Sequence, residues 1–334
     1  MKNVRIALDA MGTDRHPAVE VAGAVEALRD LPDGFTLILI GDQPRIEDEL
    51  ARFDAVPGDR LEIVHATQRI EPSEAPATVV RRKPNSSIVL ALMQQREGAA
   101  DACVSAGSTG AVMAASLLLL GALPGIHRPA IATVLPTAAD PMVMLDAGAN
   151  VDSKPYHLVQ FAHLGAIYAR DVMRRPHPRI GLLNIGEEPE KGNELAVETH
   201  KLLRKSGLDF VGNVEGRDVI RGVCDVLVTD GFVGNVLLKF YESVAGFMYS
   251  LLTRELAPVQ AELDLAKVFQ VLDYTEYGGA PLLGVNGLSI ICHGGSPPRA
   301  IKNAIRVAIQ AVETNMLGHI RREVAGAVPI AEGA

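Results

Sequence analysis

Short apolar runs alternate with amphipathic stretches along almost the whole chain, and this alternation limits the folds that the chain can adopt. Several runs are apolar over nearly their whole length instead of at every second position, among them FTLILI (35–40), AIATVL (130–135) and MVMLDA (142–147). Strands of this kind are covered on both faces. Because they alternate with helical stretches, we predict an α/β fold with a doubly wound, Rossmann-like and mainly parallel sheet.

The pattern places the expected elements by residue number. The expected strands are 4–9, 35–40, 60–64, 102–106, 130–135, 142–147, 179–185, 223–229 and 287–292. The expected helices are 17–29, 84–97, 110–123, 155–174, 190–206, 234–257 and 297–316. We predict a single α/β catalytic domain over 1–328, with a helical excursion near 234–275 and a loose tail at 329–334.

Composition and charge argue against several classes of protein. The 334 residues are 48% hydrophobic but only 4% aromatic, without Trp, so the core is expected to consist chiefly of Ala, Val, Leu and Ile. The formal net charge of -8 argues against a nucleic-acid partner, because nucleic-acid binders usually present a basic face.

Signs of secretion or membrane insertion are also missing. Cys103, Cys224 and Cys292 stand far apart without a C-x-x-C pair, which favours buried, reduced thiols. An apolar run begins directly at Val4 and leaves no room for a signal peptide. The uncharged stretch 103–126 has fewer continuous apolar residues than the roughly 20 that span a bilayer, so we expect a buried helix there and a cytoplasmic protein.

A glycine-containing turn follows six of the expected strands. The turns are AMGTD (10–14), SAGSTGA (105–111), DAGANVD (146–152), NIGEEPEKGN (184–193), DGFVGN (230–235) and CHGGSPP (292–298). In a parallel sheet such turns gather along one edge, where α/β enzymes bind ligands. Any one of them could serve packing alone, but six together, several with Asp or Asn, predict a ligand site.

Missing motifs narrow the choice of ligand. No G-x-G-x-x-G follows the first strand, and neither a G-x-x-x-x-G-K-[ST] phosphate loop nor a G-x-S-x-G elbow is present. Asp and His residues lack metal-ligand spacing, so we expect no metal, and we expect no other cofactor. The remaining candidate ligand is a small anion held by backbone N–H groups and hydroxyls.

The turn SAGSTGA opens an uncharged helix and is the best candidate anion site, because a helix N-terminus presents free N–H groups and a partial positive charge. Its candidate phosphate ligands are Gly107, Ser108, Thr109 and Gly110. Arg82 or Lys83 could add positive charge, with a solvated basic face as the alternative.

Together these segments resemble the phosphate acyltransferase family of phospholipid synthesis, also called PlsX, from Ile6 to about Asn315. The resemblance rests on ALDAMGTD (7–14), RRKPNSS (81–87), SAGSTGA (105–111), LDAGANVDSKP (145–155), GLLNIGEEPEKG (181–192), GNVEGRD (212–218), TDGFVGNVLLK (229–239), YGGAPLLGVNG (277–287) and HGGSPPRAIKNAI (293–305). Thr13 departs from a usual Gly and Ser108 from a usual Asn. The resemblance implies a fold like that of isopropylmalate dehydrogenases and phosphotransacetylases.

The resemblance also implies a reaction, in which a fatty acyl group passes from an acyl-carrier-protein thioester to inorganic phosphate. Phosphate is then the nucleophile, so no activated Ser or Cys is needed. Candidates for orienting phosphate or moving a proton to the leaving sulfur are Asp9, Asp146, Asn150, Lys154, Lys191, Asp230 and His293. For the carboxylates, capping of the next helix is the alternative.

Partners follow from the same resemblance: acyl carrier protein, inorganic phosphate, a second copy of the chain, and a membrane glycerol-3-phosphate acyltransferase met at the inner face of the cell membrane. The broad apolar stripe of helix 235–256 has three alternative explanations, namely a core position, a dimer interface and peripheral membrane contact. The alternative functions are a phosphotransacetylase-like enzyme that uses acyl-coenzyme A and a non-enzymatic acyl- or phospholipid-binding scaffold.

Overall fold

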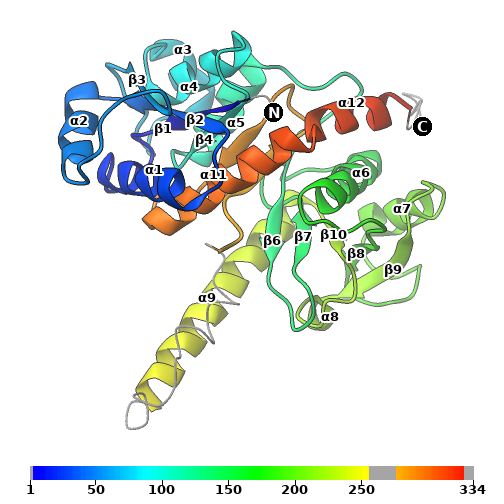
Figure 1. Cartoon of the computed structure of the whole chain (residues 1–334). Coiled ribbons are helices and arrows are strands. Elements are labelled where there is room, and N and C mark those ends of the chain that lie inside the picture. The colour runs from blue at the N-terminus through cyan, green and yellow to red at the C-terminus, as the bar shows by residue number, and fades with distance from the viewer. Residues whose placement is uncertain (1–2, 256–275, 327–334) are drawn as a thin grey trace. The chain divides into compact units, whose positions relative to one another are not determined.

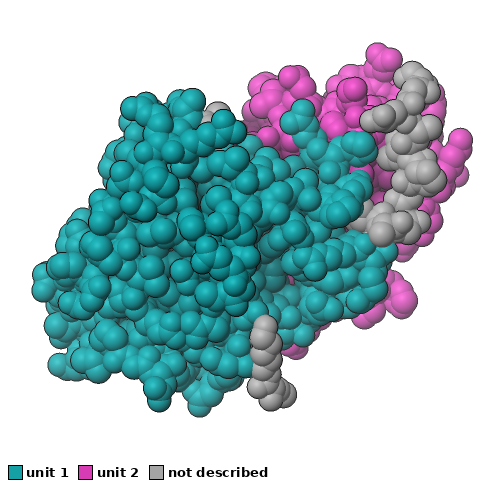
Figure 2. Space-filling view, turned by 90° about the horizontal axis from the view of Figure 1, so that it is seen from above, with its two compact units in different colours: residues 1–129, 277–328 teal, residues 130–276, 329–334 magenta. Residues whose placement is uncertain are grey.

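The chain forms two compact units in the computed structural model, which describes residues 3–255 and 276–326 (Figure 2). Unit 1 comprises residues 1–129 and 277–328, and unit 2 comprises residues 130–276 and 329–334. Two compact units do not decide whether 1–328 acts as a single catalytic domain, so that assignment stays a prediction. The expected tail at 329–334 lies outside the described residues.

Unit 1 contains a mainly parallel sheet (Figure 1). Its strands are β1 (Val4–Asp9), β2 (Phe35–Gly41), β3 (Leu61–His65), β4 (Ala102–Ser105), β11 (Ala280–Leu283) and β12 (Ser289–Ile291). They run in the order β3-β2-β1-β4-β12-β11, and only β11 is antiparallel to its neighbour β12. The sequence explains this sheet, because β1, β2 and β4 are almost wholly buried and apolar.

Seven helices belong to the described part of unit 1. They are α1 (Ala18–Asp30), α2 (Gln43–Ala51), α3 (Pro76–Arg82), α4 (Ser87–Arg96), α5 (Thr109–Leu119), α11 (Pro298–Glu313) and α12 (Met316–Gly326). The helix expected over 110–123 ends at Leu119, since Gly121 has a φ of +78°. Its expected burial is correct for one face only, because Leu117 and Leu118 are exposed.

Unit 2 has its own five-stranded sheet in the order β6-β7-β10-β8-β9. Its strands are β6 (Thr133–Leu135), β7 (Met142–Leu145), β8 (Ile180–Asn184), β9 (Phe210–Glu215) and β10 (Val226–Val228), and the two-residue strand β5 (Ala130–Ile131) precedes them. Only β6 is antiparallel to its neighbour. Its helices are α6 (Pro155–Asp171), α7 (Glu194–Leu203), α8 (Gly216–Val219) and α9 (Gly231–Glu255).

The predicted α/β class with mainly parallel strands is confirmed, although the strands belong to two sheets. The strand expected over 130–135 is split into β5 and β6. Strands β9 and β11 and helices α2, α3, α8 and α12 were not predicted.

Helix α9 begins the expected excursion and extends away from the sheet of unit 2 (Figure 1); the rest of the excursion, 256–275, lies outside the described residues. Only Gly231 and Gly234 of α9 are buried. Phe240 and Phe247 are 66% and 64% exposed, so this helix is not a core element within the described residues. No helix within 3–255 or 276–326 is both long and apolar enough to cross a membrane.

Candidate functional site

Three of the glycine turns meet at one edge of the unit 1 sheet. They follow β1, β4 and β12, which are parallel neighbours, so their carboxyl ends lie together. A Cβ on Gly12 would lie 2.5 Å from the Gly107 nitrogen, and the Asp14 N–H donates to the Gly294 carbonyl at 2.9 Å. The expected clustering of these turns is therefore seen within unit 1.

Asp9 lies fully buried beneath these turns and connects two of them. Its Oδ2 accepts from Ser105 Oγ at 2.6 Å, and its Oδ1 accepts from the Met11 N–H at 3.0 Å. Ser105 Oγ in turn accepts from the Gly107 N–H at 3.1 Å. Burial raises the pKa of Asp9, against the opposing effect of hydrogen bonds from Ser105 and Ser87. These contacts show a carboxylate that shapes the turns.

Glu20 is a second buried carboxyl group at this edge, and no sequence motif pointed to it. It accepts from the Thr13 N–H at 2.6 Å and from Thr13 Oγ1 at 2.9 Å. Burial raises the pKa of Glu20 to about 7. Thr13 is not among the residues with positive φ, so the Thr at this position causes no strain of that kind.

The raised pKa of Glu20 predicts a pH-dependent stability. The folded state binds a proton more tightly than the unfolded state, in which the pKa of a Glu lies near 4.3, so the free energy of unfolding should fall as pH rises from about 5 to above 7. In Glu20→Gln the part of this fall that Glu20 contributes, roughly 3 kcal/mol at full extent, should be lost, while any part from the buried Asp9 and Asp146 stays. Urea unfolding at pH 5 and pH 8 measures this change in the free energy of unfolding.

The control is Glu26→Gln, at a half-buried position on the same helix. Equal pH dependence of the parent and Glu20→Gln would contradict the prediction.

The N-terminus of α5 presents the predicted anion site. Ser108 is its N-cap residue but makes no side-chain cap hydrogen bond, and Thr109 is exposed in the first turn. Two hydroxyls thus lie beside the free N–H groups of this turn, an arrangement that suits a phosphate. A Cβ on Gly110 would lie 2.7 Å from Pro76 Cγ, so Gly110 also permits close packing of α3 on α5.

Of the two expected cations, Lys83 is paired and Arg82 is exposed. Lys83 Nζ contacts Glu74 Oε2 at 2.5 Å and the Arg69 carbonyl at 2.8 Å, and Arg82 is exposed on α3. Arg69 was not predicted, yet its Nε donates to the Met11 carbonyl at 2.8 Å. Its charge also lowers the pKa of Asp9, which offsets part of the effect of burial. Arg69 thus contacts the turn 10–14 after β1, and its Nη1 also pairs with Glu71 Oε2 at 2.5 Å.

His293 lies exposed in the turn after β12. Its Nδ1 accepts from the Gly295 N–H at 3.1 Å, so the proton of the neutral ring is on Nε2. Helix α11 begins shortly afterwards at Pro298, as the sequence predicted.

In unit 2, Asp146 organises the turn after β7. It is fully buried, and its two oxygens accept the N–H groups of Ile131, Gly148, Ala149 and Asn150 and the Asn150 side-chain amide, at 2.7 to 3.1 Å. Burial raises the pKa of Asp146, and these hydrogen bonds oppose the rise. Five accepted bonds show that Asp146 holds the turn in shape.

The turn before α9 packs directly on the turn after β7. A Cβ on Gly234 would lie 2.0 Å from the Asp146 carbonyl oxygen, and the Gly231 N–H donates to the Asn150 carbonyl at 2.8 Å. Asp230 Oδ1 accepts from the N–H groups of Phe232 and Val233, both at 3.0 Å. Asp230 therefore caps α9, the role foreseen as the alternative to catalysis.

The two predicted lysines of unit 2 are exposed at the starts of helices. Lys154 precedes α6, with its ammonium 5.9 Å from the Tyr156 ring centre. Lys191 precedes α7, and its carbonyl accepts from Asn184 Nδ2 at 2.9 Å. Both lysines are therefore accessible to solvent.

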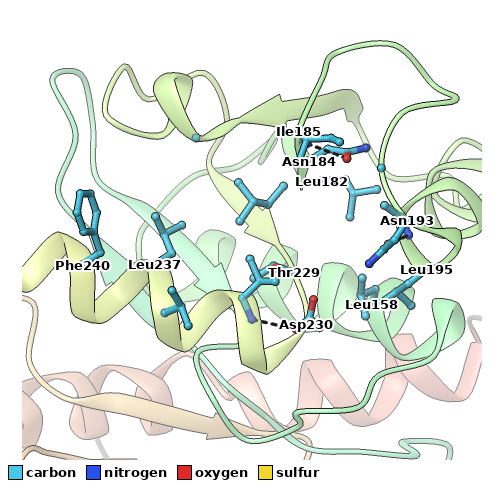
Figure 3. A pocket seen from close by; sticks show the side chains of 16 residues that line it. Leu158, Leu182, Asn184, Ile185, Asn193, Leu195, Thr229, Asp230, Leu237 and Phe240 are labelled. Carbon is cyan, nitrogen blue, oxygen red and sulfur yellow. Dashed lines mark hydrogen bonds between the residues drawn. The ribbon is translucent and has the colours of Figure 1, made fainter.

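Unit 2 also contains an apolar cavity of about 580 Å³ between α7 and α9, above the carboxyl ends of β8 and β10 (Figure 3). Among the residues that line it are Leu158, Leu182, Leu195, Thr229, Leu237 and Phe240. Asp230 is the one predicted site residue in its lining. Sequence reasoning missed the cavity, because its walls come from segments far apart in the chain.

The three cysteines are free and buried, as expected. Burial raises the pKa of Cys224 and Cys292 to about 12 and that of Cys103 further, so none is a reactive thiolate. Within 3–255 and 276–326, no group of three His, Cys, Asp or Glu side chains could hold a metal ion.

Comparison with known proteins gives consistent matches. A family model described as "Fatty acid synthesis protein" matches residues 4–318. Phosphate acyltransferases from Pelotomaculum thermopropionicum and Heliobacterium modesticaldum are 51% and 50% identical, over 96% and 97% of this chain and 95% and 99% of theirs. A phosphotransacetylase structure from Streptococcus pyogenes superposes with a TM-score of 0.63 at 17% identity, covering 93% of this chain and 94% of that one. That likeness concerns the fold.

Proposed function

The chain belongs to the fatty acid synthesis protein family that includes these phosphate acyltransferases, and we propose that it transfers a fatty acyl group from acyl carrier protein to inorganic phosphate. A phosphate oxygen attacks the thioester carbonyl, the C–O bond forms, the C–S bond breaks, and the leaving thiolate takes up a proton. The products are an acyl phosphate and the free carrier thiol. The acyl phosphate would serve phospholipid synthesis.

The observation that supports this proposal best is the start of α5. The Ser108 hydroxyl makes no hydrogen bond that caps the helix, and Thr109 is exposed. Together with the free N–H groups of the turn, these two hydroxyls form an anion site that needs no nucleophilic side chain. Holding phosphate and thioester in attack geometry can supply up to roughly 7–11 kcal/mol. We assign phosphate to this turn, with Arg82 or Lys83 as the supporting cation and Arg69 as a further candidate.

Proton transfer needs a group that reaches the reacting atoms. Asp9 and Asp146 are fully buried and already accept several hydrogen bonds, so we propose that they hold the turns in place. His293, Lys154 and Lys191 are exposed and remain the candidates for protonating the thiolate or stabilising an oxyanion.

The proposed partners are acyl carrier protein, a second copy of the chain and the membrane enzyme that consumes the product. The exposed apolar side chains of α9, such as Phe240 and Phe247, support a dimer interface or peripheral contact with the cytoplasmic face of the membrane. Two arginines that could dock the acidic carrier already form ion pairs within the protein. Arg175 pairs with Asp140 at 2.9 Å, and Arg179 pairs with Asp225 at 3.0 Å.

Radiolabelled phosphate provides the test of this function. The purified protein should convert it into an acyl phosphate when palmitoyl-acyl carrier protein is present. Faster labelling with palmitoyl-coenzyme A would instead favour the phosphotransacetylase-like alternative. A protein that binds the acyl carrier but labels no product with either donor would be a scaffold, and the proposed function would be wrong.

A further inference from the structure

We infer that the apolar cavity between α7 and α9 binds the hydrocarbon chain of the acyl donor and sets the chain length that the protein prefers. This inference rests on the proposed function, because it assigns a place to the acyl group of the same reaction. The cavity belongs entirely to unit 2 and is formed by its own side chains.

The volume and lining of the cavity fit a hydrocarbon chain. Leu158 and Leu182 in this lining are almost fully buried, at 2% and 1% exposure. Leu195 on α7 and Leu237 on α9 form facing walls (Figure 3). The volume of about 580 Å³ lies within the range of ligand sites, roughly 300–1,000 Å³.

Several polar atoms that line the cavity are already hydrogen-bonded within the protein. Asn193 Oδ1 accepts from the Ala196 N–H at 2.9 Å, and Asn184 both donates to the Lys191 carbonyl and accepts from the Ile185 N–H. Asp230 Oδ1 accepts two N–H groups of α9. A polar ligand would have to compete with these hydrogen bonds, and the carboxylate of Asp230 would repel phosphate.

Exposed apolar side chains continue the cavity outward. Ile185 is 81% exposed and Phe240 is 66% exposed, and both belong to its lining. A hydrocarbon chain would remove this surface from water, and each methylene buried strengthens binding about fourfold. Asp230, which lines the cavity, belongs to the turn that packs on the turn of Asp146 and Asn150, so the cavity adjoins the polar turns of unit 2.

The test compares donors of increasing length, from butanoyl- to hexadecanoyl-acyl carrier protein, by their kcat/KM. Leu195→Trp narrows the cavity, so the hexadecanoyl donor should lose at least about tenfold while the butanoyl donor changes little. Leu195→Ala should shift the preference toward longer chains. Val197→Trp is the matched control, since Val197 is half-buried on the same helix but outside the cavity. Leu237→Trp repeats the test from the facing wall if Leu195→Trp does not fold.

A second readout separates this inference from the proposed function. Dodecanoate binding, measured by calorimetry, needs no turnover and should weaken in Leu195→Trp but not in Val197→Trp. If the parent makes no acyl phosphate but shows this binding pattern, the function is wrong and the cavity assignment stands. Equal loss for all donor lengths, or dodecanoate binding unchanged in both wall variants, overturns the assignment. So does loss of dimerisation in Leu195→Trp without an effect on dodecanoate, which would place a second copy there.

Discussion

Replacing Ser108 and Thr109 together by Ala is expected to raise the KM for inorganic phosphate about 100-fold, because two hydrogen bonds to a charged ligand contribute roughly 1.5 kcal/mol or more each. The KM for the acyl donor should change little, since these hydroxyls lie at the start of α5 in unit 1. Initial rates measured over a range of phosphate concentrations check the expectation.

Thr78→Ala is the control for this double replacement. Thr78 is an exposed threonine on α3, which packs against α5, and its hydroxyl donates to the Ala75 carbonyl. Its loss should leave both KM values unchanged. If the double variant keeps the phosphate dependence of the parent, the anion site lies elsewhere.

Asp146→Ala is expected to lower the free energy of unfolding of unit 2 by about 3–5 kcal/mol, because a buried carboxylate that accepts five hydrogen bonds would leave its donors unpaired. Hydrogen exchange is the sharper measurement, since the amides of Gly148, Ala149 and Asn150 should lose their protection.

The exposed Asp140 supplies the comparison for this loss. Its carboxylate is 68% exposed and pairs with Arg175, so Asp140→Ala should cost less than about 1 kcal/mol. Asp146→Asn keeps the size of the side chain but leaves one acceptor oxygen, and an intermediate loss is expected. Equal stability of parent and Asp146→Ala would show that the turn holds its shape without these bonds.

The fold could be predicted as far as local patterns determine it. Strands such as β1 and β2 are mostly apolar and buried, so their limits were predicted almost to the residue. Strand β9 was missed because FVGNVE contains Gly212 at a φ of +110° and is half-exposed. Helix α2 was missed although Asp42 caps it and Pro44 opens its first turn, a start signal that was available.

The candidate site was predictable only in part, for a different reason. The glycine turns after β1, β4 and β12 meet at one edge as expected, because strand direction alone brings these turns together. The state of each polar group depends on partners from distant segments: Lys83 is held by Glu74, and Ser105 by Asp9. Glu20 and Arg69 carry no motif, so only the fold reveals them.

The buried thiols provide the protein with internal reporters of unfolding. Cys103 and Cys292 belong to unit 1 and Cys224 belongs to unit 2, and all three are enclosed. An alkylating reagent can therefore modify each thiol only when its surroundings open. Peptide mass spectrometry after timed alkylation would follow the opening of the two units separately, in one tube and without introducing any label.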